Sequence, residues 1–285
     1  SGSYGQWGVI ALGNYGVLDS CRIFGNKARY IIGNDRNSGT MASIISNNTF
    51  YGNSSSVDGN TYDDVSVIHV EQPKSRVFNN LLFRNLTTAI DFGLNGSDSM
   101  IFINNTITLN KGYGVKFTSN GSPYGGYLIN NIIKFNTQID IFTNVANNGP
   151  DVYIKNNFFG TSGSLFGTNL QDVSKVTILD TTGNIGGDPY FVDTLNNNYR
   201  LKAQSRAIGA GATHTYPNSK DIEGNDRINP WRLKPDIGAF ESAYKFTSPL
   251  LTKTEPGNKK VAIFWSQTPN TNIKAYKVFR STSTI

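Results

Sequence analysis

The stretches INNTITLN (residues 103–110) and INNIIKFN (residues 129–136) are near copies of one another, 26 residues apart. Related segments are LDSCRIFGN (18–26), ISNNTFYGN (45–53), FNNLLFRN (78–85) and IKNNFFG (154–160). The second position of the asparagine pair is occupied by Cys21, Asn48, Asn80, Asn105, Asn131 and Asn157. Successive members of this series are 27, 32, 25, 26 and 26 residues apart. A second series follows five residues later at Asn26, Asn53, Asn85, Asn110 and Asn136. Two series in fixed phase indicate a repeat architecture.

Short alternating strands fill the space between and after these asparagines. Residues 106–109 and 132–135 alternate as strands do, and further apolar runs follow the second asparagine at residues 89–92 and 114–117. Three short strands and turns in about 26 residues match one coil of a parallel β-solenoid, whose coils stack at about 4.8 Å. Stacked asparagines hydrogen-bond along the axis and tolerate unusual backbone angles, so we expect both series to be structural.

Composition agrees with an all-β chain and excludes several functions. Of 285 residues only 16% are charged, whereas Gly reaches 29 and Asn 35, which favours turns over long helices. The net charge of +6 is scattered, so no nucleic-acid surface is expected. A single cysteine, Cys21, and two histidines give no disulfide framework or thiolate zinc site. No apolar run approaches about 18 residues, so the chain is not expected to be membrane-embedded.

The repeat resembles the right-handed parallel β-helix superfamily, which includes pectate lyases and many bacterial surface proteins, over about residues 1–160. The resemblance implies an all-β, right-handed parallel β-helix. It does not choose a function, because the same coil carries lyases, hydrolases, phage tailspikes and non-catalytic adhesins. Residues 8–14 align with residues 114–120, so we expect a preceding coil in a longer protein.

Residues 161–244 are predicted to form the last coils and an irregular C-terminal cap. The segments GDPYFV (187–192), NYRL (198–201), SRAIGAG (205–211), DIEGNDR (221–227) and DIGAFE (236–241) resemble the tail of bacterial secreted β-helix proteins of the choice-of-anchor type. That resemblance implies a secreted or cell-surface protein. Asp221, Arg227, Asp236 and Glu241 are expected to clamp the irregular backbone through charge-assisted hydrogen bonds.

Calcium at Asp221 and Glu223 is the alternative, although this segment lacks the alternating ligand pattern of a calcium loop. We therefore expect no cofactor and assign no metal ligands. Residues 245–285 contain two alternating strands, KVAIFW (260–265) and AYKVFR (275–280), which resemble the opening strands of a fibronectin type III domain. This resemblance implies a partial β-sandwich module with Trp265 in its core, and further domains of the same chain.

The candidate ligand-binding site is a column of charged residues on one sheet. Asp91 and Lys116 each lie six residues after the second asparagine, and both should point outward because Ile90 and Val115 point inward. An insertion at residues 54–64 precedes VSVIHVE (65–71), so His69 or Glu71 is expected beside Asp91. A lyase acting on acidic polysaccharide needs a group that neutralises the uronate carboxylate, together with a basic residue to abstract a proton.

Two other interpretations of these residues stay open. His69, Glu71, Asp91 and Lys116 could instead be solvated residues on an outward strand face, with Asp91 and Lys116 forming a modest cross-coil pair. Three tyrosines are either sugar-stacking platforms or turn and edge residues: Tyr113, Tyr124 and Tyr127. No catalytic residue is assigned.

The leading functional hypothesis is a non-catalytic module of a secreted bacterial protein, a rigid adhesin or spacer with polysaccharide as its candidate partner. The alternative is a polysaccharide lyase or glycoside hydrolase acting on an acidic glycan. A phage or virus fibre is a third hypothesis, which a trimeric assembly would favour.

Overall fold

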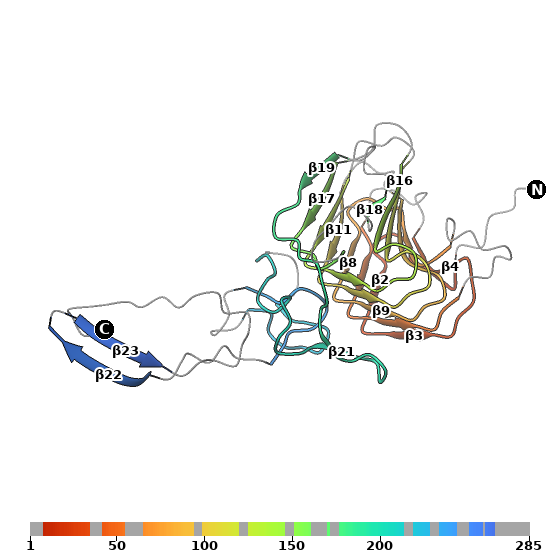
Figure 1. The fold of residues 1–285 in the computed structure, drawn as a ribbon. Coiled ribbons are helices and arrows are strands. Elements are labelled where there is room, and N and C mark those ends of the chain that lie inside the picture. Colours follow the sequence, from red (N-terminus) through yellow and green to blue (C-terminus); the bar gives the residue numbers. More distant parts are fainter. Residues whose placement is uncertain are drawn as a thin grey trace, which may run out of the picture.

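The computed structural model describes residues 8–34, 42–54, 65–93, 99–119, 125–145, 151–160, 170–171, 177–213, 219–228, 234–243, 251–258 and 260–265 (Figure 1). These residues form strands and turns, and three parallel sheets dominate the arrangement. The predicted all-β parallel β-helix is therefore confirmed. Within these ranges there is no helix of the length and apolarity that crossing a membrane requires.

Each sheet takes one strand from each successive coil. Sheet A contains, in spatial order, β1 (Ile10–Ala11), β4 (Tyr30–Asn34), β7 (Ser66–Val70), β10 (Thr88–Gly93), β13 (Val115–Ser119), β16 (Ile141–Val145) and β18 (Leu170–Gln171). Sheet B contains β2 (Val17–Asp19), β5 (Ile44–Ser46), β8 (Arg76–Phe78), β11 (Met100–Ile103), β14 (Gly126–Ile129), β17 (Asp151–Lys155) and β19 (Thr177–Asp180). Sheet C contains β3 (Arg22–Phe24), β6 (Thr49–Tyr51), β9 (Leu81–Phe83), β12 (Thr106–Thr108) and β15 (Ile132–Lys134).

The three sheets enclose one apolar core. Alternation along each strand sends every second side chain inward, so Ile90 and Phe92 of β10 lie in the core while Asp91 points out. Leu82 of β9 and Phe102 of β11 enter the same core from the other two sheets. This alternation fixes which residues of sheet A form its outward face.

The first asparagine series closes the turn between sheets B and C. Asn48, Asn80, Asn105 and Asn131 each donate from Nδ2 to the Oδ1 of the equivalent asparagine one coil on, at 2.9–3.0 Å. The preceding asparagine of each pair adopts a left-handed backbone, with φ between 52° and 58° at Asn47, Asn79, Asn104, Asn130 and Asn156. The structural role predicted for this series is confirmed. At its start the half-buried, free Cys21 donates its backbone N–H to Asn48 Oδ1 at 2.9 Å.

The second asparagine series ends on a carboxylate. Asn26, Asn53, Asn85 and Asn110 each donate from Nδ2 to the Oδ1 of the equivalent asparagine of the following coil, at 2.9–3.1 Å. Asn136 instead donates from its backbone N and its Nδ2 to Asp140 Oδ1, at 3.4 and 3.2 Å. Asp140 therefore stands where the next asparagine would be. Burial raises the pKa of this carboxyl above its ordinary value.

The irregular C-terminal segment packs along the side of the β-helix. It includes the antiparallel pair β20 (Phe191–Asp193) and β21 (Asn198–Leu201). Its apolar side chains form a second core with outward residues of sheet C and the following coil: Leu81, Phe83, Ile132 and Phe158. Figure 1 shows this segment, coloured teal to blue, beside the coils. The segment therefore covers the apolar outward face of sheet C.

A separate antiparallel hairpin follows, formed by β22 (Leu251–Gly257) and β23 (Lys260–Trp265). Every residue of both strands is exposed, and Trp265 is 37% exposed. Trp265 thus does not lie in a core formed by the described residues, and its place in the core of a β-sandwich module stays a prediction. The predicted strand at residues 275–280 lies outside the described residues.

Candidate functional site: a charged column on sheet A

The outward face of sheet A brings the four predicted residues together. Parallel pairing places His69 of β7 opposite Asp91 of β10, and Asp91 opposite Lys116 of β13. Glu71 follows directly after β7. The predicted alignment of Asp91 with Lys116 is confirmed, and His69 joins their column despite the insertion that precedes its strand.

The charges alternate along this column. His69 Nε2 lies 3.3 Å from Glu71 Oε1, and His69 Nδ1 lies 3.3 Å from Asp91 Oδ2. Lys116 Nζ lies 4.0 Å from the same Asp91 oxygen. Thr118 completes the surroundings of Asp91 by donating its hydroxyl to Oδ1 at 2.9 Å. Each ionised group therefore has a group of opposite charge beside it.

Three of the four side chains are buried although they point away from the core. The side chains of His69, Asp91 and Lys116 are 6%, 5% and 2% exposed, and that of Glu71 is 20% exposed. The Tyr30 ring stacks on the His69 imidazole with centroids 4.1 Å apart and planes 10° apart. The interpretation of these residues as solvated is thus wrong, because neighbouring side chains cover the outward face.

The surrounding charges fix the ionisation of the column. Burial alone would lower the pKa of His69, but the carboxylates of Asp91 and Glu71 outweigh it and raise the pKa to about 9. Burial would raise the pKa of Asp91, but His69 and Lys116 outweigh it and hold that pKa below its ordinary value. At neutral pH His69 is therefore an imidazolium, which cannot accept a proton as a general base.

Two of the three tyrosines considered for sugar stacking each use one ring face on another aromatic ring. Tyr113 stacks on Phe142 at 4.3 Å, and Tyr127 stacks on Tyr153 at 4.6 Å. These contacts favour the interpretation as turn and edge residues, while Tyr124 lies outside the described residues. A third stack was not predicted from the sequence: Tyr51 lies between Phe24 and Phe83 on sheet C, with ring centroids 5.0 and 5.2 Å apart. The sequence signal for this stack was an aromatic residue as the third residue of β3, β6 and β9.

Comparison with known proteins adds a structural similarity. No protein-family model matches this chain, and no curated protein matches it either. A solved structure of pectate lyase Pel9A is similar to it. The two share 16% sequence identity with a TM-score of 0.43, over 81% of this chain and 69% of the other.

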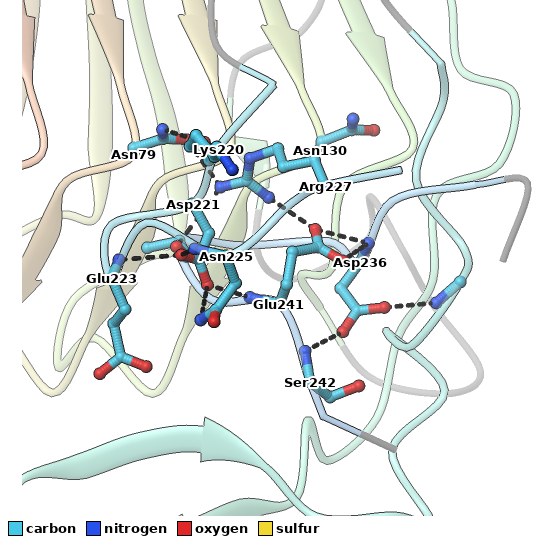
Figure 2. A network of polar contacts seen from close by, with 12 residues as sticks. Asn79, Asn130, Lys220, Asp221, Glu223, Asn225, Arg227, Asp236, Glu241 and Ser242 are labelled. Atoms are coloured by element: carbon cyan, nitrogen blue, oxygen red, sulfur yellow. Dashed lines mark hydrogen bonds and ion pairs between the residues drawn. The ribbon is translucent and has the colours of Figure 1, made fainter. Parts of the chain in front are cut away.

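The four residues predicted as a structural clamp also meet, and all are buried. Arg227 donates from Nη1 to Glu241 Oε1 at 2.8 Å and from Nη2 to Asn79 Oδ1 at 2.6 Å (Figure 2). Glu241 in turn accepts the backbone N–H of Asp236 at 3.0 Å, and Asp236 accepts the N–H of Gly209 at 2.8 Å. Together they tie irregular backbone to the β-helix.

The first asparagines of the pairs are docking groups that the sequence analysis missed. Asn79 Nδ2 donates to Lys220 O at 2.9 Å, and Asn156 Nδ2 donates to Ala210 O at 3.0 Å. Asn130 donates to Ala212 O at 2.9 Å and accepts the N–H of Ala212 at 2.8 Å. No role was predicted for these asparagines, because their contacts depend on packing between segments that are far apart in the sequence.

The carboxylate of Asp221 does not fit calcium. Its Oδ1 accepts the N–H groups of Glu223 and Asn225 at 2.9 and 2.8 Å, and its Oδ2 accepts the N–H of Glu241 at 2.7 Å (Figure 2). Glu223 is paired with Arg200. Donors thus occupy the oxygens that a hard cation would need. Across the described part of the chain, no group of three or more His, Cys, Asp or Glu residues is arranged to hold a metal.

Proposed function

We propose that this chain is a non-catalytic β-helix module of a secreted or cell-surface bacterial protein, a rigid adhesin or spacer that binds acidic polysaccharide. The observation that carries the non-catalytic role is the charged column. Its histidine lies between the carboxylates of Glu71 and Asp91, which raise its pKa to about 9, and its lysine is 2% exposed and shares Asp91 with that histidine. Neither group is available to take a proton from a sugar.

Rigidity follows from how each coil is joined to the next. Three parallel sheets and two asparagine series connect successive coils on all sides, so no coil can move alone without breaking several hydrogen bonds. Such a rod separates what is attached to its ends at a fixed distance. The extracellular location and the attachment to fibronectin-type and anchoring domains are parts of this proposal, and they rest on the resemblances at residues 184–242 and 245–285.

A polysaccharide lyase or glycoside hydrolase is the second candidate. It is favoured by one observation, the contact of His69, Asp91 and Lys116 on a single outward face. Under this alternative Lys116 would be the base, which requires it to lose its proton and become accessible. We expect the first proposal to hold, because a lyase would need Lys116, which is 2% exposed, to leave Asp91 and reach the substrate.

A glycan screen on the purified chain, with and without calcium, tests both candidates. Binding is measured together with the absorbance of newly formed unsaturated uronates and with the release of reducing ends. Binding without product supports the module. Product that disappears in Lys116→Ala, but persists in the exposed control Lys111→Ala, would establish a lyase instead. Reducing ends without unsaturated product would establish a hydrolase, and an absence of binding would contradict the polysaccharide partner.

A further inference from the structure

Glu71 differs from the other members of the charged column. With His69 protonated, the inner residues His69, Asp91 and Lys116 carry a net charge of +1, and Glu71 supplies the charge that balances it. Its side chain is 20% exposed, against 6%, 5% and 2% for the other three. The balancing carboxylate is therefore the member of the column that solvent reaches.

The space around Glu71 depends on a residue without a side chain. A Cβ atom at Gly93 would lie 2.6 Å from Glu71 Cγ and 3.0 Å from Glu71 Oε1. Gly93 closes β10 on the same strand as Asp91. The absence of a side chain at Gly93 thus leaves room for the Glu71 carboxylate beside the His69 imidazole. This is the end of the column where the side chain is most exposed to solvent.

We propose that His69 forms an anion site that Glu71 occupies in this structure, and that the carboxylate of a hexuronate unit in an acidic polysaccharide displaces Glu71 from it. This inference deepens the proposed function and rests on its acidic-polysaccharide ligand. One carboxylate would replace another, so the charge around the imidazolium stays balanced and Nε2–H keeps an anionic acceptor. Asp91 stays 3.3 Å from the other imidazole nitrogen, Nδ1, and Lys116 stays beside Asp91.

The ionisation of the column makes this exchange feasible at neutral pH. Asp91 contacts Nδ1 independently of Glu71, so His69 retains a carboxylate partner when Glu71 leaves. The stack with Tyr30 keeps the ring in position. The site is therefore preorganised for an anion, and Glu71 acts as an internal competitor.

The test compares the affinity of the full chain for trigalacturonate by calorimetry. Glu71→Ala and the isosteric Glu71→Gln remove the competitor, and Glu223→Ala is the matched control because it removes one negative charge from the exposed ion pair with Arg200. We expect both Glu71 variants to bind about tenfold more tightly than the wild type, as one charge-assisted hydrogen bond would give. The control should bind as the wild type does, and Glu71→Ala/His69→Gln should lose the gain.

Unchanged affinity in the Glu71 variants would overturn the inference even if the wild type binds polysaccharide elsewhere. Binding of trigalacturonate by these variants and not by the wild type would overturn the displacement of Glu71, because the wild-type carboxylate would then keep the site closed, and it would also contradict the proposed function. Equal binding of poly-L-glutamate would overturn the assignment to a polysaccharide. If a Glu71 variant does not fold, the chain's two histidines allow a test on the wild type: trigalacturonate should shift the imidazole resonances of His69, and unshifted resonances would contradict the site.

Discussion

Arg227 and Asn79 are 148 residues apart in the sequence, yet Arg227 Nη2 donates to Asn79 Oδ1 at 2.6 Å. The same guanidinium forms a buried ion pair with Glu241. Burial lowers the pKa of Arg227, and the nearby carboxylates of Glu241 and Asp221 only partly offset this effect. This single side chain thus connects the C-terminal segment to the turn of a central coil.

We expect Arg227→Met to destabilise the protein by about 3–5 kcal/mol, because it leaves Glu241 buried without its cation. Chemical denaturation followed by circular dichroism measures the loss. Lys220→Ala is the control, since Lys220 and Asp226 form an ion pair with both side chains more than half exposed. That change should cost less than about 1 kcal/mol. Equal effects of the two substitutions would contradict the clamp.

Removing one asparagine from the middle of a series should be more harmful than removing one from its end. Asn105 is fully buried and donates from Nδ2 to Asn131 Oδ1, while its own Oδ1 accepts from Asn80. We expect Asn105→Ala to cost at least about 3 kcal/mol, since several buried polar groups lose partners at once. Asn26→Ala, at the half-buried end of the other series, should cost about 1 kcal/mol. Thermal unfolding of both variants checks this order.

Alanine substitution at two glycines with positive φ distinguishes the cost of a steric clash from the cost of backbone strain. At Gly238, with φ +106°, a Cβ would lie 2.7 Å from Ile132 Cδ1 and 2.9 Å from Thr106 Oγ1. At Gly224, with φ +86°, no heavy atom lies within 4 Å of the added Cβ. Gly238→Ala should therefore loosen the C-terminal segment from sheet C, and Gly224→Ala should cost only about 1 kcal/mol of backbone strain. Limited proteolysis should cleave the Gly238 variant first, and the reverse order would refute the packing described for Gly238.

The stability that His69 contributes should depend on pH. Its folded pKa of about 9 lies above the ordinary 6.5, so its contribution is complete below pH 6.5 and is lost as the pH rises toward 9. The difference in unfolding free energy between the wild type and His69→Gln should therefore shrink across that window. Asp91, whose pKa is lowered, should contribute above its ordinary 3.8 and lose that contribution as the pH falls below it. A difference that stays constant from pH 6 to 10 would exclude the proposed charge on His69.

The sequence predicted features that repeat and missed features that depend on packing between distant segments. The asparagine series and the pairing of Asp91 with Lys116 follow from a regular period, because each coil repeats the same local interactions. The burial of His69 depends on the ring of Tyr30 from another coil. The role of Asp140 was hidden because a carboxylate four residues after Asn136 breaks the repeat, although it accepts the same two hydrogen bonds.

The position of the C-terminal segment along the side of the β-helix also determines how the protein carries mechanical load. Asn79, Asn130 and Asn156 belong to three different coils, and each is hydrogen-bonded to this segment. A pull applied through the β22–β23 hairpin is therefore shared among several coils before it reaches any single strand. To detach the C-terminal segment, these hydrogen bonds and the apolar contacts with sheet C must break together. The contacts are therefore loaded in parallel, in shear, and the coils are not unwound one by one from the end.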